Sequence, residues 1–379
     1  MSSAVRRSSS TVPVLAGRNP ASEPAIASGK AGRPGVLLVA SLFKLPYRVL
    51  RCATAAGAEV HVLAGRGARG LRLSRYCRQW VPSRCPIDGS QNEALAVEID
   101  RLARELGIAM VLPGDAPATR SVIACREQLT TPTFALPPLE TFDLLNDKWE
   151  FTQLCGRLGM RHPASCRFDG PAGLSEAIAA GKIGFPSVAK PLSMSGGEGF
   201  VRLGARSPQR RNRIDYRPII VQEFVAGEDV SASIFARQGE ITAFVAYRHG
   251  RGVYTTFWSD LIFADLRRLA RHLMLDGLYN FDMRQSGDGR IHYLECNPRV
   301  FFTIDSALIA GINFLACGLP GSASSAGALI RDEIAIHRPK AIATAPRHWP
   351  HLTGKDLAMA VHLYADPVPH LLEGARILA

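Results

Sequence analysis

The chain has 379 residues, of which 47% are hydrophobic and 21% are charged, so it can bury a sizeable core spread over two or three domains. Its formal net charge is +12, but the basic residues are spread along the chain, which disfavours nucleic acid as a partner because such binding needs a clustered basic face. No apolar run approaches the roughly 20 residues of a membrane-spanning helix, so we expect a soluble protein with no membrane partner.

The first 34 residues are rich in Ser, Ala, Pro and Arg and show no apolar period. We therefore expect residues 1–34 to be a disordered tail. An organelle transit peptide is the alternative, but the segment lacks a clear amphipathic face. The eight cysteines of the chain are scattered without a CxxC pair, which argues against zinc and against a disulfide framework. A reducing, cytoplasmic location follows.

Residues 35–140 alternate short apolar strands with helical stretches such as Glu93–Leu106, which predicts a small parallel sheet with crossover helices. The predicted strands are Val36–Ala40, Val60–Ala64, Met110–Pro113 and Thr133–Leu136. Ser41, Gly114 and Asp115 follow strands, at the edge where open α/β sheets bind ligands. No GxGxxG fingerprint follows the first strand, so a dinucleotide dehydrogenase is disfavoured.

Residues 141–218 are predicted to form a second unit, which begins with a helix. Asp147 caps the helix and Glu150 stands at the reciprocal capping-box position. Two strands follow, Pro186–Lys190 and Gly199–Leu203, joined by a glycine-rich turn.

Residues 219–330 are predicted to form an antiparallel-sheet domain, and residues 331–379 a C-terminal segment of mixed character. The expected elements are strands at Ile219–Phe224, Val230–Arg237 and Ile241–Tyr247, a helix near Leu266–Leu275, and two closing strands.

The two closing strands carry the most informative pattern, around a predicted two-residue hairpin turn at Asp288-Gly289. That register places Asp282 opposite Glu295 and Asn280 opposite Asn297, and it turns Phe281, Met283, Leu294 and Cys296 to the other face. One face of the hairpin is then apolar, and the other is a row of oxygen donors.

Two opposed carboxylates repel each other unless positive charge lies between them. Asp282, Glu295 and Asn297 supply the hard oxygen ligands that suit Mg²⁺, with Mn²⁺ as the alternative ion. Two other readings stay open: an exposed hairpin with solvated acids, or neutralisation by Arg284, which the same register places opposite Tyr293.

Two further segments favour a nucleotide site. Lys190 ends a strand directly before Pro191–Gly199, a glycine-rich loop whose amides could wrap phosphate oxygens. Only seven of the 45 basic residues are Lys, so we take Lys148 and Lys190 as places where a compact ammonium is needed. The second segment, Val221–Asp229, is a strand that runs into a glycine turn flanked by acids.

In this order and spacing, these segments resemble the ATP-grasp superfamily, particularly its carbamoyl-phosphate-synthase-like branch, over roughly Gly35–Phe314. The resemblance implies α/β and α+β structure, in which a Rossmann-like domain, a lid domain and an antiparallel-sheet domain clasp ATP. It also implies the role of each site residue. The phosphates would contact Lys148, Lys190 and the loop residues Ser195, Gly196 and Gly197. The adenine would contact Gln222, Glu223, Phe224 and Val225, and Glu228 would bind the ribose. The metal ligands would be Asp282, Glu295 and Asn297, and Arg299 would contact the transferring phosphoryl group.

The resemblance further implies an ADP-forming ligase with catalytic residues Lys190 and Arg299, which activates a small-molecule carboxylate for attack by an amine. Two alternatives remain: an ATP-grasp kinase that phosphorylates a hydroxyl, and a non-catalytic protein that binds nucleotide or nucleic acid. A homodimer stays open as the assembly. After Arg299 the chain continues with Val300-Phe301-Phe302, where many relatives have small or Gly-rich residues, so the acceptor cannot be copied from a relative.

Overall fold

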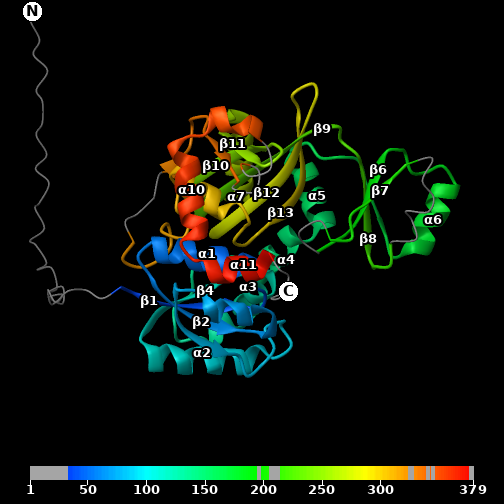
Figure 1. Cartoon of the computed structure of the whole chain (residues 1–379). Coiled ribbons are helices and arrows are strands. Elements are labelled where there is room, and N and C mark those ends of the chain that lie inside the picture. The colour runs from blue at the N-terminus through cyan, green and yellow to red at the C-terminus, as the bar shows by residue number, and fades with distance from the viewer. Residues whose placement is uncertain are drawn as a thin grey trace, which may run out of the picture. The chain divides into compact units, whose positions relative to one another are not determined.

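The computed structural model describes residues 33–193, 198–204, 214–322, 328–338, 342 and 346–374, which contain three β-sheets (Figure 1). All but the last two residues of the predicted tail lie outside this described part of the chain. No helix among the described residues is long and apolar enough to cross a membrane.

The first sheet is parallel, with strand order β3-β2-β1-β4. Its strands are β1 (Gly35–Ala40), β2 (Glu59–Ala64), β3 (Cys77–Pro82) and β4 (Ile108–Pro113). Alternate side chains of β1 enter different cores. Val36 and Leu38 pack in the same core as helix α1 (Lys44–Ala55), whereas Leu37 and Val39 pack in the same core as α2 (Asn92–Leu106). The two helices therefore cover opposite faces of the sheet.

A buried carboxylate joins the carboxyl ends of β1 and β4. Asp115 caps α3 (Ala116–Cys125) by accepting a hydrogen bond from the Ala118 N–H at 3.0 Å. It also accepts from the Ser41 and Leu42 N–H groups, both at 2.8 Å, and from the Ser41 hydroxyl at 2.8 Å. Short 3₁₀ helices η1 (Arg66–Leu73) and η2 (Arg126–Gln128) complete the connections.

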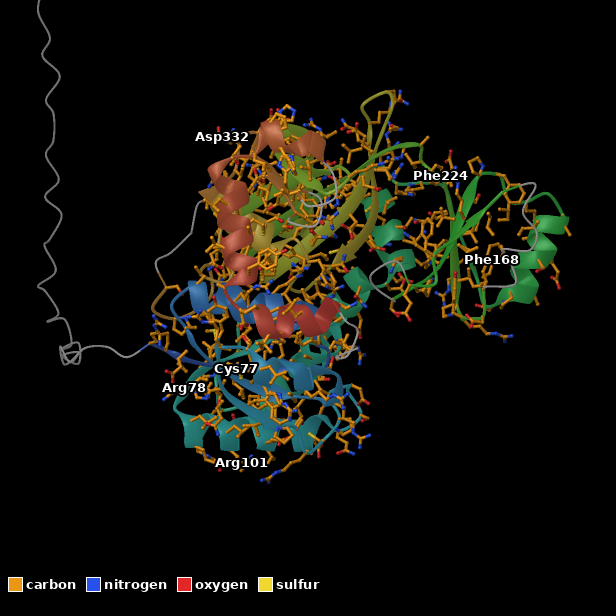
Figure 2. All side chains as sticks on the ribbon, viewed as in Figure 1. Cys77, Arg78, Arg101, Phe168, Phe224 and Asp332 are labelled. Atoms are coloured by element: carbon orange, nitrogen blue, oxygen red, sulfur yellow. The ribbon has the colours of Figure 1, made fainter. Side chains whose placement is uncertain are left out.

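Two helices lead from the parallel sheet into the next sheet. They are α4 (Leu139–Asn146) and α5 (Lys148–Arg157), and the Asp147 carboxylate caps α5 by accepting from the Trp149 and Glu150 N–H groups, as the sequence predicted. The second sheet has the order β5-β8-β6-β7 and is antiparallel, and α6 packs on it (Figure 2). Its elements are β5 (Ser165–Phe168), α6 (Pro171–Ala179), β6 (Ser187–Pro191), β7 (Val201–Leu203) and β8 (Ile219–Glu223).

The third sheet has seven strands, in the order β13-β12-β9-β10-β11-β15, and β14 pairs with β10. The strands are β9 (Gly227–Arg237), β10 (Glu240–His249), β11 (Val253–Phe257), β12 (Gly277–Ser286), β13 (Ile291–Asn297), β14 (Ala328–Leu329) and β15 (Ala335–His337). Helices α5 and α7 (Asp260–His272) share one core with this sheet, in which Phe151, Leu266 and Phe281 are fully buried. Helix α8 (Ile304–Ala310) contributes to a different core, the one that contains α1.

The C-terminal segment consists of η4 (Pro346–His351), α10 (Gly354–Tyr364) and α11 (Pro367–Gly374), and it contacts elements near the start of the chain. The Asp305 carboxylate on α8 accepts hydrogen bonds from Arg48 at 2.6 Å and Arg51 at 2.8 Å, and its other oxygen lies 2.7 Å from His362 Nε2. Burial opposes ionisation of Asp305, but His362, Arg51 and Arg48 outweigh it and hold its pKa far below the usual range. A second tie runs from the Tyr47 hydroxyl to the Asp366 carbonyl at 2.7 Å.

Cys52, Asp305 and His362 have donor atoms within 4.8 Å of one another, which is the spacing of a metal-binding group. Two arginines already neutralise Asp305, and burial keeps the pKa of the Cys52 thiol well above its ordinary value. We therefore interpret the cluster as a buried ion pair that holds α10 against α1, and not as a metal site.

Comparison with the predicted elements shows several differences. Strands β3, β5 and β11 were not predicted. Strand β8 was predicted as part of the antiparallel-sheet domain from residue 219, but it belongs to the second sheet. Thr133–Leu136 was predicted as a strand, but only an isolated bridge joins Thr133 to Val111. The helix predicted near Leu266–Leu275 is α7, which begins earlier because the Ser259 hydroxyl caps it by accepting from the Ile262 N–H. It ends at His272, and Met274 beyond it has φ of 48°, which a right-handed helix does not allow.

Candidate active site

The row of oxygen donors predicted on β12 and β13 is present. Asp282 pairs with Glu295 and Asn280 with Asn297, as the sequence predicted. The predicted two-residue turn is wrong, however. Ser286 and Arg290 flank a three-residue loop in which Gly289 has φ of 82°, which is the conformation of a three-residue hairpin with a bulge. This loop shifts the pairing by one residue, and a second irregularity between Asp282 and Met283 shifts it back.

The shifted stretch corrects two predictions. Arg284 faces His292 instead of Tyr293, and Tyr293 is buried in the core where Leu294 was expected. Leu294 is only partly buried and lines a cavity beside the row. Arg284 does not neutralise the opposed acids either: its guanidinium donates to Asp229 at 2.6 Å and to two backbone carbonyls, those of Val225 and Gly227.

Two lysines neutralise one of the acids, Glu295, instead. The Lys148 Nζ atom lies 3.3 Å from Glu295 Oε2, and the Lys190 Nζ atom lies 3.8 Å from the same oxygen. Burial opposes ionisation of Glu295, but Lys148 and then Lys190 outweigh it, so the pKa of Glu295 is lowered. Burial also disfavours the ammonium of Lys190 and lowers its pKa to about 8. The predicted phosphate-binding lysines and the predicted metal-binding row therefore meet at one carboxylate.

Asp282 is held by amides and not by cations. Its carboxylate oxygens accept hydrogen bonds from Asn280 Nδ2 at 3.0 Å and Asn297 Nδ2 at 3.1 Å. Burial, and then the charge of Glu295, raises the pKa of Asp282 to about 7. At neutral pH this pair therefore carries like-charge strain, which bound positive charge would relieve.

The donor set fits a hard divalent cation. Asp282, Glu295 and Asn297 line one cavity of about 210 Å³, and Mg²⁺ prefers a few protein oxygens together with water and phosphate. Arg299 closes the row by donating to Asn297 Oδ1 at 2.8 Å and to its neighbouring carbonyl, that of Val300, at 2.9 Å. Burial lowers the pKa of Arg299.

We call this space the polar cavity. Ser231, His249 and Tyr254 line its other side, and the Ser231 hydroxyl lies 2.7 Å from His249 Nε2. Sequence reasoning missed these residues, because β9 to β11 carry no motif there. Two buried polar atoms, Arg299 Nε and Thr303 Oγ1, have no hydrogen-bond partner among the described residues. Such atoms mark a place where a polar ligand would be stabilised.

A second cavity, of about 250 Å³, lies between the second and third sheets, and we call it the hinge cavity. Its lining includes Val188 and Lys190 from β6, the predicted adenine-binding run Gln222, Glu223, Phe224 and Val225, and Asp229, Arg284 and Leu294. Figure 2 shows Phe224 where β8 leads into β9. The Arg202 guanidinium lies 3.9 Å from the centre of the Phe224 ring, which gives this cavity a cation–π contact.

The acid in the hinge cavity differs from the predicted one. Glu228 was expected to hold the ribose. Both Glu228 and Asp229 are exposed, but Asp229 is among the residues that line the cavity and Glu228 is not. Gly227 fixes this arrangement, because its φ is 142° and a Cβ there would collide with the Gln285 carbonyl on β12. The Gln222 side chain donates to Ser165 Oγ at 3.1 Å. Ser195, Gly196 and Gly197 lie outside the described residues.

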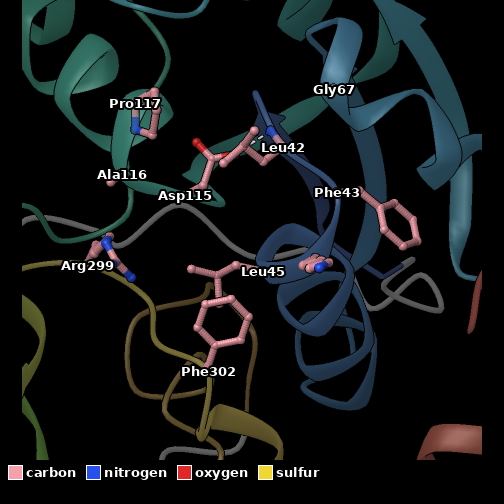
Figure 3. A pocket seen from close by; sticks show the side chains of 10 residues that line it. Leu42, Phe43, Leu45, Gly67, Asp115, Ala116, Pro117, Arg299 and Phe302 are labelled. Carbon is pink, nitrogen blue, oxygen red and sulfur yellow. Dashed lines mark hydrogen bonds between the residues drawn. The ribbon is translucent and has the colours of Figure 1, made fainter. Parts of the chain in front are cut away.

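A third cavity, of about 250 Å³, touches the polar cavity at Arg299 and Phe302 (Figure 3). Phe301 is buried and stacks edge-on against Phe314, whereas Phe302 is 47% exposed and reaches both cavities. The departure noted after Arg299 thus consists of two buried residues, Val300 and Phe301, and the half-exposed Phe302. Phe301 also lines the polar cavity, and Phe302 lines both cavities.

Comparison with known proteins supports the fold. The family described as "ATP-grasp in the biosynthetic pathway with Ter operon" matches residues 215–335. The arginine-specific large chain of carbamoyl phosphate synthase from Bacillus subtilis (strain 168) is 25% identical over 187 residues, which are 44% of this chain but only 18% of that protein.

Solved structures of other proteins share the fold. The L-amino acid ligase from Bacillus licheniformis has a TM-score of 0.57 and 18% identity, with 75% of this chain and 73% of that chain covered. The biotin carboxylase domain of the Hydrogenobacter thermophilus 2-oxoglutarate carboxylase, crystallised with MgADP and bicarbonate, has a TM-score of 0.57 and 16% identity, with 74% and 67% covered.

Proposed function

We propose that this chain, which contains an ATP-grasp domain within an ATP-grasp fold, is an ATP- and magnesium-dependent ligase. It would activate a small-molecule carboxylate as an acyl phosphate and pass the acyl group to an amine, releasing ADP and phosphate. The observation that carries this proposal is the convergence of Lys148 and Lys190 on Glu295, beside Asp282 and Arg299. Fixed positive charge beside oxygen donors is what phosphoryl transfer requires.

ATP would lie along the hinge cavity with its phosphates toward the lysines. The adenine would contact the run Gln222–Val225, and Asp229 would accept from the ribose hydroxyls. The Lys190 side chain lines the same cavity, and its Nζ atom contacts Glu295. Lys190 therefore connects the base-binding and phosphate-binding parts of the proposed site. In this proposal the ATP phosphates would replace Glu295 as the partner of both lysines.

The reaction would take place at the boundary of the polar cavity. An oxygen of the substrate carboxylate would attack the γ-phosphorus of ATP while the bond to the β-phosphate oxygen breaks. Arg299 would donate at the point where the substrate carboxylate meets the transferring phosphoryl group, because its Nε atom has no hydrogen-bond partner among the described residues. Asp282, Glu295 and Asn297 would hold Mg²⁺, which when bound supplies charge neutralisation and orients the phosphates. The amine would then attack the acyl carbon, lose a proton and expel phosphate.

The test is an ADP-release screen of the purified protein with mixed carboxylates and amines, followed by mass spectrometry of the product. We expect ADP release that needs both substrates and Mg²⁺, and an amide as the product. The matched control is Lys190→Ala, which should bind no ATP productively and release no ADP. ADP release with a hydroxyl compound alone would show a kinase and contradict the ligase proposal.

A further inference from the structure

The third cavity is enclosed mainly by apolar side chains, and we call it the apolar cavity. Its apolar lining is Leu42, Phe43, Leu45, Ala116, Pro117 and Phe302. The first three follow the carboxyl end of β1, Ala116 and Pro117 begin α3, and Phe302 follows β13 (Figure 3). An apolar space of this kind favours the hydrocarbon part of a ligand over water.

The charged groups of the apolar cavity leave one open position for an anion. Asp115 lines it, but its carboxylate already accepts four hydrogen bonds, from the Ser41 N–H and hydroxyl, the Leu42 N–H and the Ala118 N–H. Lys44 is exposed, so its ammonium stays solvated. Arg299 is 6% exposed, and its Nε atom has no hydrogen-bond partner in the described part of the chain.

Arg299 and Phe302 line both the apolar cavity and the polar cavity. A single molecule could therefore place a carboxylate at Arg299, on the side of the oxygen row, and a hydrocarbon body among Leu42, Leu45 and Phe302. We propose that the carboxylate substrate of this protein is an acid with a large apolar or aromatic body, which the apolar cavity holds while Arg299 receives the carboxylate. This inference rests on the proposed ligase function, because it assigns the carboxylate to the same site.

The size of the apolar cavity sets the size of that body. A cavity of roughly 150 Å³ lined by apolar side chains accepts a benzene ring. The apolar cavity measures about 250 Å³, so it can hold a six-membered ring with a short linker, or an alkyl chain of similar bulk. Small hydrophilic acids would leave the apolar side chains of this cavity in contact with water.

The test is calorimetric binding of straight-chain acids from propanoate to octanoate, and of 3-phenylpropanoate, to the protein with Mg²⁺ and a non-hydrolysable ATP analogue. Burial of each methylene should tighten the dissociation constant about fourfold until the cavity is full. Phe302→Ser and Leu42→Ser should each weaken octanoate and 3-phenylpropanoate at least fivefold and leave propanoate unchanged. Both residues are largely exposed, at 47% and 56%, so neither substitution should prevent folding.

The matched control is Leu261→Ser on α7, because Leu261 is 55% exposed and lies outside all three cavities. It should leave the whole series unchanged. A flat series in protein that binds the ATP analogue would overturn the substrate class and leave the ligase proposal standing. Failure to bind the analogue would instead refute the proposed function. If alkylamines show the chain-length trend and acids do not, the apolar cavity serves the nucleophile and the inference is wrong.

Discussion

Neutralising Asp282 tests the assignment of the oxygen row, because Asp282 and Glu295 have different partners. Asp282 accepts amide hydrogen bonds from Asn280 and Asn297 and carries a raised pKa of about 7. Glu295 is the counter-ion of Lys148 and Lys190. In ligand-free protein, Asp282→Asn should therefore relieve strain, whereas Glu295→Gln should leave two ammonium groups without their carboxylate.

The magnitudes follow from the same contacts. A rise in pKa from 3.8 to about 7 would correspond to about 4 kcal/mol at pH 8, and we take about 2 kcal/mol because Asp282 is only partly buried. Losing one of two amide hydrogen bonds costs about 1 kcal/mol, so Asp282→Asn should raise the free energy of unfolding by about 1 kcal/mol. Glu295→Gln should lower it by about 3 kcal/mol.

The assay is urea unfolding at pH 8, with and without Mg-ATP. At 100 times its dissociation constant, Mg-ATP should add about 2.7 kcal/mol to the wild-type protein. If Asp282→Asn weakens binding 100-fold, the increment at the same concentration falls to about 0.4 kcal/mol. The expected signature is therefore a variant that is more stable alone and barely stabilised by ligand. An Asp282→Asn protein that keeps the full Mg-ATP increment would show that the row is not the metal site.

Three further predictions concern neighbouring groups. Lys190→Ala should abolish ATP turnover with little change in the unfolding midpoint. Lys190→Arg should also turn over ATP poorly, because a guanidinium fork replaces a compact ammonium. Normal turnover of the alanine variant would remove Lys190 from the mechanism. Because the folded-state pKa of Asp282 is raised, its contribution to stability is fully present below about pH 4 and is lost as pH rises to about 7. The difference in unfolding free energy between wild type and Asp282→Asn should therefore change sign across that range. A constant difference would contradict the raised pKa. Asp229→Asn should weaken ATP binding about tenfold in an equilibrium titration, whereas Glu228→Gln should leave it unchanged. The opposite ranking would identify Glu228 as the residue that binds the ribose.

The sequence predicted the elements that hold the site better than the details of the site. Strands with strong apolar patterns, such as Val36–Ala40, were found almost in place as β1. The Asp282 and Glu295 pairing was correct although the turn was not, because the three-residue loop and the later irregularity cancel. A pairing rule read from the turn alone cannot see an irregularity five residues away.

Contacts between distant segments explain the other differences. The sequence offered Arg284 as the neutralising cation, but the positions of β6 and α5 bring Lys190 and Lys148 to Glu295 instead. Asp229 and Glu228 are adjacent acids, and no local pattern shows that Asp229 is the one that lines the hinge cavity. The apolar cavity combines residues that follow β1, β4 and β13, so no local pattern announces it.

The ties around Asp305 bear on how the chain folds. Arg51 is 3% exposed, and its carboxylate partner lies 254 residues later in the chain. The Tyr47 hydroxyl donates to the carbonyl of Asp366, 319 residues later in the chain. Without those partners, the buried position of the Arg51 guanidinium would lack its counter-ion, so α1 and the parallel sheet reach their final packing only together with α8 and the C-terminal helices. The final packing of α1 therefore depends on residues more than 250 positions later in the chain, so the parallel sheet with α1 is not an independent folding unit.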